Sequence, residues 1–322
     1  MPAFSVIVPI YNAEKTLRRC LNSLRDQSFS DFEVLMIENG SSDASNNICR
    51  AYASGDSRFL LHSCEKNTGP SGARNIGLEQ VRGEWVVFVD SDDYVTLDYL
   101  EQLQRVFTAK HADVVFFGYR QINVDETEVA VHIPQIPEKA SCYEILASLS
   151  KQDMFGYTWI KAFRADSIGE KRFSAELNLM EDEVFTCEVL EQGCHIEVLP
   201  APFYYYVTGN TGSLVGRTHQ DYCMKLDAAY CAWKKLLTGS PDCADLLREK
   251  ANSHVSKCMY YGFERDVDPD EFFRNLAQCK FFADSNLNTA FYLSVKNGDL
   301  RKLRQMRSKY RLKVTVSKLF KR

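Results

Sequence analysis

Acidic side chains follow an apolar run in the first third of the chain. Trp85-Val-Val-Phe-Val89 leads directly into Asp90-Ser91-Asp92-Asp93. Such a run predicts a buried strand, and ligands of open α/β sheets bind at the carboxyl ends of strands. Because three carboxylates this close repel one another, a divalent cation such as Mg²⁺ or Mn²⁺ carrying substrate phosphates is the natural partner. The alternative interpretation is an acidic helix N-terminus without a metal.

Polar residues also lie at the ends of the two strands predicted earlier in the chain. Pro9, Tyr11 and Glu14 belong to the first of these ends, and Glu38 and Asn39 to the second. A ring such as Tyr11 can stack on a nucleobase or cap the core, and Glu38 or Asn39 can accept a hydrogen bond from a base N–H. Turn chemistry is the alternative for the second end, because Asn-Gly and Ser-Asp favour turns and caps.

A third polar loop, Asn67-Thr-Gly-Pro-Ser-Gly-Ala-Arg-Asn-Ile-Gly77, leads into a helix predicted to begin near Gly72. The N–H groups at a helix N-terminus can hold an anion. Arg74 in the first turn opposes the helix dipole unless a negative group lies nearby, which favours a functional role. The loop does not match GxxxxGK[ST], and no GxGxxG follows the first strand, which argues against a P-loop NTPase and a dinucleotide-binding domain.

Strand and helix patterns alternate through the first 120 residues. Strands are predicted at 4–9, 32–37, 58–62, 85–89 and 113–118, and helices at 15–26, 43–54, 72–81 and 97–110. This alternation predicts βαβ units and a parallel sheet. Residues 123–138 are predicted to be a connection. Later residues predict a helix at 182–191, strands near 196–199 and 203–207, and a helical region from about 219 onward.

Composition narrows the class of protein. A hydrophobic content of 45% and a charged content of 25% are typical of soluble globular proteins. No run of 18 apolar residues predicts a transmembrane helix, and the N-terminus lacks the features of a signal peptide. Eleven cysteines, an odd number without CxxC pairs, argue against a zinc site or a disulfide framework and predict a reducing cytosol.

The first hundred residues resemble a known family. The segments SVIVPIYNAEKTLRRCLNSLRDQSFSDFEVLMIENGSSDAS and NTGPSGARNIGLEQVRGEWVVFVDSDD are similar, nearly continuously from Phe4 to about Leu100, to family-2 inverting glycosyltransferases of the bacterial surface-polysaccharide type. The resemblance implies the α/β GT-A fold, a Rossmann-like and mostly parallel central sheet flanked by helices. It implies a transferase domain at 1–217, with a nucleotide-binding half at 1–120 and an acceptor half at 121–217. A helical region at 218–322 would follow.

The resemblance also implies a site for a nucleotide-sugar donor. Asn39 stands where the family usually has the second of two aspartates, which meets the N3–H of uracil, so it keeps an acceptor oxygen and loses the charge. Asp90-Ser91-Asp92 would be the DxD motif, with Asp92 as the direct ligand of Mn²⁺ or Mg²⁺ and Asp90 beside it near the ribose or sugar. The implied donor-binding residues are Pro9, Tyr11, Glu14, Glu38, Asn39, Gly69, Arg74, Asp90, Ser91 and Lys161.

The second half should supply a catalytic base. Glu181-Asp182-Glu183 resembles the ED motif of the family, which implies Asp182 as the base and Glu181 beside it; an acidic helix N-terminus is the alternative. Neighbouring carboxylates raise a carboxyl pKa, which suits a base near neutrality. Trp159-Ile-Lys161-Ala-Phe-Arg164 resembles another family segment, in which Lys161 would approach the diphosphate or acceptor. Tyr204-Tyr-Tyr206 with Gly212-Ser213 resembles the loop that closes the donor site.

The C-terminal segment is strongly basic. Residues 300–322 contain ten Lys or Arg and no Asp or Glu, so the rest of the chain carries 29 basic and 43 acidic residues, a net charge of −14. Leu300, Leu303, Met306, Tyr310 and Val314 fall at helical spacing, which predicts a basic amphipathic helix on an anionic membrane surface. The alternatives are a solvated tail and a strand at 312–316. No RNA-binding module is present, so nucleic acid is not expected.

Together these features predict a metal-dependent inverting glycosyltransferase, cytoplasmic and peripheral on the inner face of the membrane. The expected donor is a UDP-sugar, and the expected acceptor is a hydroxyl of a growing, lipid-linked surface glycan. A sugar-1-phosphate nucleotidyltransferase is the alternative enzyme, although Pro9-Ile-Tyr-Asn replaces the basic Gly-rich loop that it would need. A non-catalytic nucleotide-sugar-binding or scaffolding module of the same fold is the alternative that Asn39 motivates.

Overall fold

The computed structural model describes residues 1–109, 112–191, 195–209, 218–238 and 243–319. The chain forms two compact units, Met1–Gly212 and Ser213–Arg322. Each unit is described separately below. The domain boundary predicted after residue 217 falls at the end of 210–217, a segment outside the described residues.

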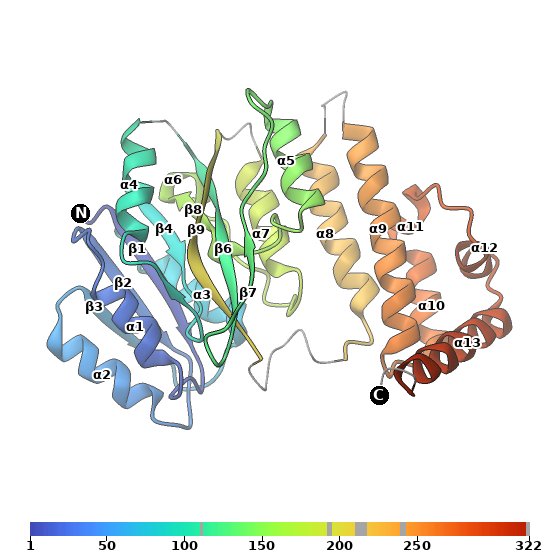
Figure 1. Cartoon of the computed structure of the whole chain (residues 1–322), viewed down its shortest axis with the longest axis horizontal. Coiled ribbons are helices and arrows are strands. Elements are labelled where there is room, and N and C mark those ends of the chain that lie inside the picture. The colour runs from blue at the N-terminus through green and yellow to red at the C-terminus, as the bar shows by residue number, and fades with distance from the viewer. Residues whose placement is uncertain (110–111, 192–194, 210–217, 239–242, 320–322) are drawn as a thin grey trace. The chain divides into compact units, whose positions relative to one another are not determined.

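One sheet forms the centre of the first unit (Figure 1). Its order is β3-β2-β1-β4-β8-β6-β9-β5, with β7 paired to β6. Strands β3, β2, β1 and β4 are mutually parallel, whereas β8 is antiparallel to both β4 and β6, so the sheet is mixed. The strands are β1 Phe4–Ile10, β2 Phe32–Glu38, β3 Phe59–Ser63, β4 Trp85–Phe88, β5 Tyr94–Val95, β6 Val114–Asn123, β7 Glu128–His132, β8 Lys161–Arg164 and β9 Ile196–Thr208.

Amphipathic helices connect these strands. Helix α1 shows the pattern well, because its apolar Leu17, Leu21 and Leu24 are fully buried while the arginines between them stay outside the core. Helix α3 begins at Gly69, earlier than predicted, because Gly69 adopts a positive φ of 77° that a glycine tolerates and Pro70 suits a first turn. The helices are α1 Leu17–Arg25, α2 Ser45–Gly55, α3 Gly69–Glu79, α4 Tyr99–Ala109, α5 Cys142–Lys151, α6 Ala165–Ile168 and α7 Glu181–Leu190.

Two predictions for the part of the first unit after residue 120 were wrong. The expected connection at 123–138 contains strand β7, because a turn in which the Asn123 N–H donates to the Thr127 carbonyl reverses the chain onto β6. The two strands expected near 196–199 and 203–207 are one strand, β9. Its pairing with β6 shifts register around Gly118, opposite the interruption at Pro200 and Pro202. Prolines remove ladder hydrogen bonds but do not force a strand to end at a register shift.

The second unit is helical, as predicted from about residue 219. Its helices are α8 Tyr222–Leu236, α9 Cys243–Glu264, α10 Pro269–Gln278, α11 Lys280–Asp284, α12 Ala290–Lys296 and α13 Leu300–Leu319. The strand alternative at 312–316 was wrong, since α13 runs through that segment. Aromatic rings dominate the core, with Phe263 packed edge-on against both Phe273 and Phe291. Within the described part of the chain, no helix has the length and apolarity needed to cross a membrane.

Candidate active site

The acidic segment at the end of β4 forms a tight turn. The Asp93 N–H donates to the Asp90 carbonyl at 3.0 Å. The Asp93 carboxylate is buried and accepts hydrogen bonds from the Tyr204 hydroxyl and the Val207 N–H, both at 2.8 Å. The Tyr204 hydroxyl also accepts the Asp90 N–H at 3.0 Å. Asp93 therefore fixes the turn from inside, while Asp90 and Asp92 remain only half-buried at the carboxyl edge of the sheet.

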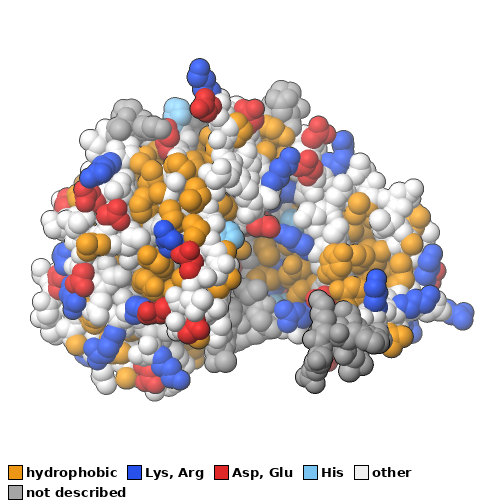
Figure 2. Space-filling view, in the orientation of Figure 1, with side chains coloured by type: hydrophobic (Ala, Val, Ile, Leu, Met, Phe, Trp, Pro, Cys, Tyr) orange, Lys and Arg blue, Asp and Glu red, His pale blue; other side chains and the backbone are white. Residues whose placement is uncertain are grey.

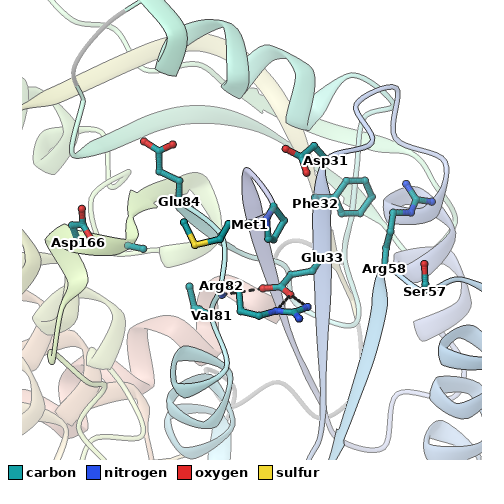
Figure 3. Close-up of a pocket in the computed structure, with 13 residues that line it drawn as sticks. Met1, Asp31, Phe32, Glu33, Ser57, Arg58, Val81, Arg82, Glu84 and Asp166 are labelled. Atoms are coloured by element: carbon teal, nitrogen blue, oxygen red, sulfur yellow. Dashed lines mark hydrogen bonds and ion pairs between the residues drawn. The ribbon is translucent and has the colours of Figure 1, made fainter.

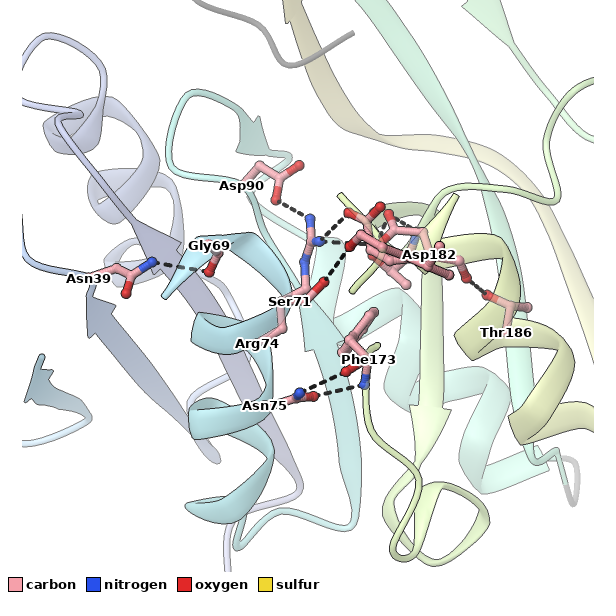
Figure 4. Close-up of polar contacts among 12 residues, drawn as sticks. Asn39, Gly69, Ser71, Arg74, Asn75, Asp90, Phe173, Asp182 and Thr186 are labelled. Atoms are coloured by element: carbon pink, nitrogen blue, oxygen red, sulfur yellow. Dashed lines mark hydrogen bonds and ion pairs between the residues drawn. The ribbon is translucent and has the colours of Figure 1, made fainter. Parts of the chain in front are cut away.

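Arg74 on α3 joins this turn to the second acidic segment (Figure 4). Its Nη2 lies 3.2 Å from Asp90 Oδ1, and its Nη1 lies 3.1 Å from Asp182 Oδ1 and 3.4 Å from Glu181 Oε1. The Arg74 side chain is only 7% exposed, so these ion pairs are shielded from solvent. Arg74 near the start of α3 opposes the helix dipole, and these three carboxylates supply the negative charge that offsets this effect. They also bring the DxD segment and the ED segment into one site.

The Glu181–Asp182 pair begins helix α7. Asp182 Oδ2 accepts hydrogen bonds from the Thr158 backbone N–H at 3.2 Å and the Thr158 hydroxyl at 3.0 Å. With Oδ1 bound to Arg74, both oxygens of Asp182 are oriented by hydrogen-bond donors. Burial, reinforced by Asp182, raises the pKa of Glu181 to about 7. The two neighbouring carboxylates therefore differ in their contacts, because Thr158 and Arg74 engage both oxygens of Asp182 whereas Arg74 alone pairs with Glu181 among the hydrogen bonds and ion pairs of the described residues.

The charge balance of the cluster fits a divalent cation. One arginine faces Asp90, Glu181 and Asp182, and burial raises the pKa of Asp90 to about 6 despite Arg74, with Asp92 adding to the rise. Asp90 and Asp92 are hard oxygen donors of the kind that Mg²⁺ and Mn²⁺ prefer. Among the described residues, no three His, Cys, Asp or Glu side chains gather closely enough to hold a metal alone. A cation here would therefore depend on substrate phosphates as well.

At the end of β2, both predicted polar side chains bind the protein itself. Asn39 is buried, and its Nδ2 donates to Asn67 Oδ1 at 3.0 Å and to the Gly69 carbonyl at 3.1 Å. Its Oδ1 accepts the Thr68 N–H and hydroxyl at 3.0 and 2.9 Å. Asn39 thus clamps the loop before α3 and has its acceptor oxygen engaged. The expected contact with a uracil N3–H has no support in this arrangement.

Glu38 is likewise buried in local contacts, since its Oε1 accepts the Ser41 N–H and its Oε2 accepts from Asn46. Glu14 caps α2, because its Oε2 accepts the Ala44 N–H at 3.1 Å. These bonds tie the loops after β1 and β2 together. The sequence predicted ligand contacts for these polar side chains, and the structure shows them bonded within and between the loops.

The remaining predicted donor residues lie along the same edge. Tyr11 directly follows β1 and is 49% exposed, so its ring is accessible to a planar ligand. Pro9 is half-buried within β1, opposite Ile37 of β2. Gly69 starts α3, and Ser91 occupies the turn between Asp90 and Asp92. The predicted closing loop at Gly212-Ser213 lies outside the described residues.

Lys161 occupies a different environment from the predicted one. It is fully buried, its Nζ donates to the Tyr157 carbonyl, and the ammonium lies 4.9 Å from the Phe116 ring centroid and 5.7 Å from that of Phe155. Burial lowers the pKa of Lys161 to about 7, and Asp182 and Glu183 oppose this effect. Rings and a carbonyl enclose Lys161, so in this structure its ammonium packs within the core. The contact with the diphosphate or acceptor stays a prediction.

Thr158 and Tyr204 were missed as site residues. Thr158 immediately precedes the family-like segment Trp159–Arg164, and threonine carries no spacing signal that would identify it as the partner of Asp182. Tyr204 was noted only as part of an aromatic run, whereas its hydroxyl holds the acidic turn. Both contacts join residues distant in sequence, so only the folded chain reveals them.

A hollow of about 1050 Å³ lies elsewhere, at the amino ends of the strands (Figure 3). Buried Glu33 there accepts hydrogen bonds from the Ser5 hydroxyl at 2.6 Å and from the Arg82 backbone N–H at 3.0 Å, and it pairs with the Arg82 guanidinium. These bonds satisfy the carboxylate. Since ligands of such sheets bind at the carboxyl edge, the hollow does not compete with the acidic cluster as the candidate site.

Comparison with solved structures supports the fold. The structure of Staphylococcus aureus TarS 1-349 in complex with UDP-GlcNAc superposes with a TM-score of 0.76 at 23% identity, covering 96% of this chain and 91% of that one. The match includes the helical C-terminal region, and it confirms the predicted GT-A fold.

Sequence relatives point the same way. EpsH of Bacillus subtilis is 32% identical over 215 residues, 64% of this chain and 60% of EpsH. The poly(ribitol-phosphate) beta-N-acetylglucosaminyltransferase TarS of Staphylococcus aureus is 30% identical over 281 residues, 84% of this chain and 47% of TarS. The chain thus spans less than two thirds of either relative. The model of glycosyl transferase family 2 matches residues 5–170, more than half of the chain. This protein therefore belongs to glycosyl transferase family 2.

Proposed function

We propose that this chain transfers a sugar from a nucleoside diphosphate sugar, with UDP as the expected nucleotide, to a hydroxyl of a growing, lipid-linked surface glycan with inversion at the anomeric carbon. The observation that carries the proposal is the Arg74 junction, which unites Asp90 of the donor half with Glu181 and Asp182 of the acceptor half. The beta-N-acetylglucosaminyltransferase activity in the name of TarS and its complex with UDP-GlcNAc support the donor class.

Asp182 would act as the base. In a single in-line displacement, the acceptor oxygen attacks C1 of the sugar, its proton passes to the Asp182 carboxylate, and the C1–oxygen bond to the diphosphate breaks. Thr158 and Arg74 hold both carboxylate oxygens in place, which preorganises the base. Glu181 is the second candidate, because its raised pKa of about 7 suits a base at neutral pH.

Asp92, with Asp90, would hold Mn²⁺ or Mg²⁺ beside the diphosphate. When bound, the cation supplies Lewis-acid stabilisation of the charge that develops on the departing nucleotide. The chain contributes the fixed geometry of the turn, because Asp93 and Tyr204 anchor it from within the core. Tyr11, exposed at the end of β1, would stack on the nucleobase.

Calorimetric titration with UDP, GDP, CDP and dTDP, with and without Mn²⁺, tests the donor class. Tight binding of UDP that depends on Mn²⁺ would support a UDP-sugar and justify a screen of UDP-sugars. Preference for another nucleotide would redirect the donor. Failure to bind all four would refute the transferase and favour the alternative of a scaffolding module of the same fold.

Three substitutions test separately the proposed metal ligand Asp92, the proposed base Asp182 and its neighbour Glu181. Asp92→Asn should abolish both transfer and metal-dependent UDP binding. Asp182→Asn should preserve UDP binding and lower turnover by roughly 10²- to 10⁴-fold, the usual contribution of a general base. Glu181→Gln is the matched control, because it removes the adjacent charge. If Glu181→Gln abolished turnover and Asp182→Asn did not, the base assignment would move to Glu181.

The second unit offers a basic surface for an anionic membrane, but not the apolar face predicted for α13. Leu303 is fully buried, and the Tyr310 ring packs against Phe263, so that face is used inside the unit. Arg307 and Arg311 donate to carbonyl oxygens at the end of α9. Figure 2 shows Lys and Arg side chains over the region of α13. The exposed cationic stripe consists of Arg301, Lys302, Lys309 and Lys313.

We therefore propose electrostatic rather than inserted contact with anionic lipid. Each basic residue near such a surface contributes about 1 kcal/mol, so Lys309→Gln with Lys313→Gln should weaken binding to phosphatidylglycerol vesicles roughly 30-fold. The control is Arg274→Gln with Lys296→Gln, which removes two exposed charges from other helices of the unit. Vesicle flotation measures the binding. An equal loss of binding in both double variants, or binding that persists at high salt, would contradict the proposal that the cationic stripe contacts the lipid.

A further inference from the structure

Three aromatic rings form a connected surface beside Asp182. We call Tyr157, Trp159 and Tyr206 the aromatic platform. The Trp159 ring is stacked with Tyr157 at a centroid distance of 5.0 Å and with Tyr206 at 5.1 Å, with interplanar angles of 26° and 13°. Trp159 is buried, whereas Tyr157 is 39% exposed and Tyr206 is half-buried. The buried tryptophan thus supports two rings that reach solvent.

The platform is continuous with both halves of the candidate site. Thr158, between Tyr157 and Trp159, is the residue that orients Asp182. Tyr206 directly precedes Val207, whose backbone N–H donates to the Asp93 carboxylate of the acidic turn at 2.8 Å. The platform therefore extends from the acidic turn to the segment that holds the proposed base.

The exposed ring of Tyr157 is held rigidly. Its backbone carbonyl accepts the buried Lys161 ammonium, and its ring rests on Trp159. Core packing accounts for Trp159, but it does not require a rigid, partly exposed tyrosine next to the base. A ring fixed before binding loses little conformational entropy when a ligand covers it.

We propose that the aromatic platform binds a pyranose ring of the acceptor, with the apolar C–H face of the sugar on Tyr157 and its hydroxyl edge toward Asp182. This inference rests on the proposed function and specifies its acceptor class. A pyranose combines an apolar face with polar edges, which matches an aromatic face flanked by a carboxylate. An open-chain polyol such as ribitol phosphate lacks a rigid face of this kind.

The position of Tyr157 indicates that the aromatic platform binds the acceptor rather than the donor sugar. The donor diphosphate is expected at Asp90 and Asp92, at the end of β4, whereas Tyr157 immediately precedes the short helical turn Thr158–Ile160 that leads into β8. The proton removed by Asp182 comes from the acceptor hydroxyl. A ring one residue from the anchor of that base is therefore placed to hold the sugar that carries this hydroxyl.

Steady-state kinetics of the full chain test the proposal, with UDP-GlcNAc as donor and p-nitrophenyl β-glucoside, β-galactoside and β-N-acetylglucosaminide as acceptors. Tyr157→Ala should raise the KM for the acceptor roughly tenfold and leave the donor KM and UDP affinity unchanged. Tyr157→Phe keeps the ring and should behave like the wild type. Tyr260→Ala is the matched control, because Tyr260 is a 51% exposed tyrosine of the second unit.

Saturation-transfer NMR with the same glycosides gives a readout that does not need turnover. Signals that are present for the wild type and Tyr157→Phe but lost in Tyr157→Ala would support the platform. An unchanged acceptor KM in Tyr157→Ala, a raised donor KM instead, or use of poly(ribitol phosphate) with no response to the glycosides would overturn it. A wild type that binds glycosides but no nucleotide would refute the proposed function while leaving the platform intact.

Discussion

Replacing Glu181 with glutamine should stabilise the protein at pH 8 and leave its stability almost unchanged near pH 4.5. The folded-state pKa of Glu181 is about 7, raised from 4.5 by burial and by Asp182. Below 4.5 the carboxyl is protonated in both the folded and the unfolded state, and above 7 it is ionised in both. Between these values the folded wild type loses stability as pH rises, because its charge is only 12% exposed.

The magnitude follows from the same pKa values. A rise from 4.5 to about 7 corresponds to a loss of about 3 kcal/mol at pH 8, an upper limit for the gain in Glu181→Gln, which cannot ionise. Urea denaturation of both proteins at pH 4.5 and pH 8 measures this difference in the free energy of unfolding. Glu79→Gln is the control, because Glu79 is exposed on α3. A Glu181→Gln protein that is less stable than the wild type at pH 8 would refute the reasoning.

Three further predictions test the contacts around the site. Asn39→Asp should destabilise the protein by about 1–3 kcal/mol and weaken UDP binding. The substitution places an anion against Asn67 Oδ1 and the Gly69 carbonyl, where the amide donated two hydrogen bonds. Tighter UDP binding in calorimetry would instead show that residue 39 turns from the loop toward the nucleobase. Thr158→Val removes one hydrogen bond to Asp182 and should lower turnover roughly tenfold while UDP affinity is retained. An unchanged turnover and pH-rate profile would exclude a role of Thr158 in orienting Asp182. Tyr204→Phe leaves the Asp90 N–H without its partner and the buried Asp93 with only the Val207 N–H, so it should cost about 1–3 kcal/mol in urea denaturation and weaken Mn²⁺-dependent UDP binding. Equal UDP affinity would show that the turn holds its shape without the hydroxyl.

The parallel half of the sheet could be predicted because its signals are local. Each strand from Phe4 to Phe88 is a short apolar run, and each intervening helix has apolar residues at helical spacing. Strand β7 was not predicted, because the segment from Glu128 to His132 has no strong apolar pattern. It becomes a strand by pairing with β6. Its stability depends on a partner rather than on its own sequence.

The membership of the candidate site was easier to predict than its contacts. Residue types identified Asp90, Asp92, Arg74 and the Glu181–Asp182 pair as functional candidates. Types do not reveal whether a polar side chain faces a ligand or another loop. The contacts of Asn39 and Lys161 could not be foreseen for this reason: Asn39 engages its donors and its acceptor within the loop that it clamps, and Lys161 is enclosed by Phe116, Phe155 and a carbonyl.

Arg74 explains why the two acidic segments need each other. Without Arg74, the three poorly solvated carboxylates of Asp90, Glu181 and Asp182 would repel one another, and together they compensate the buried guanidinium. The two segments lie far apart in the sequence, and the ion pairs of Arg74 join them. The site is therefore assembled by the same contacts that close the first unit, and its residual negative charge leaves room for a cation and a phosphate-bearing ligand to complete the balance.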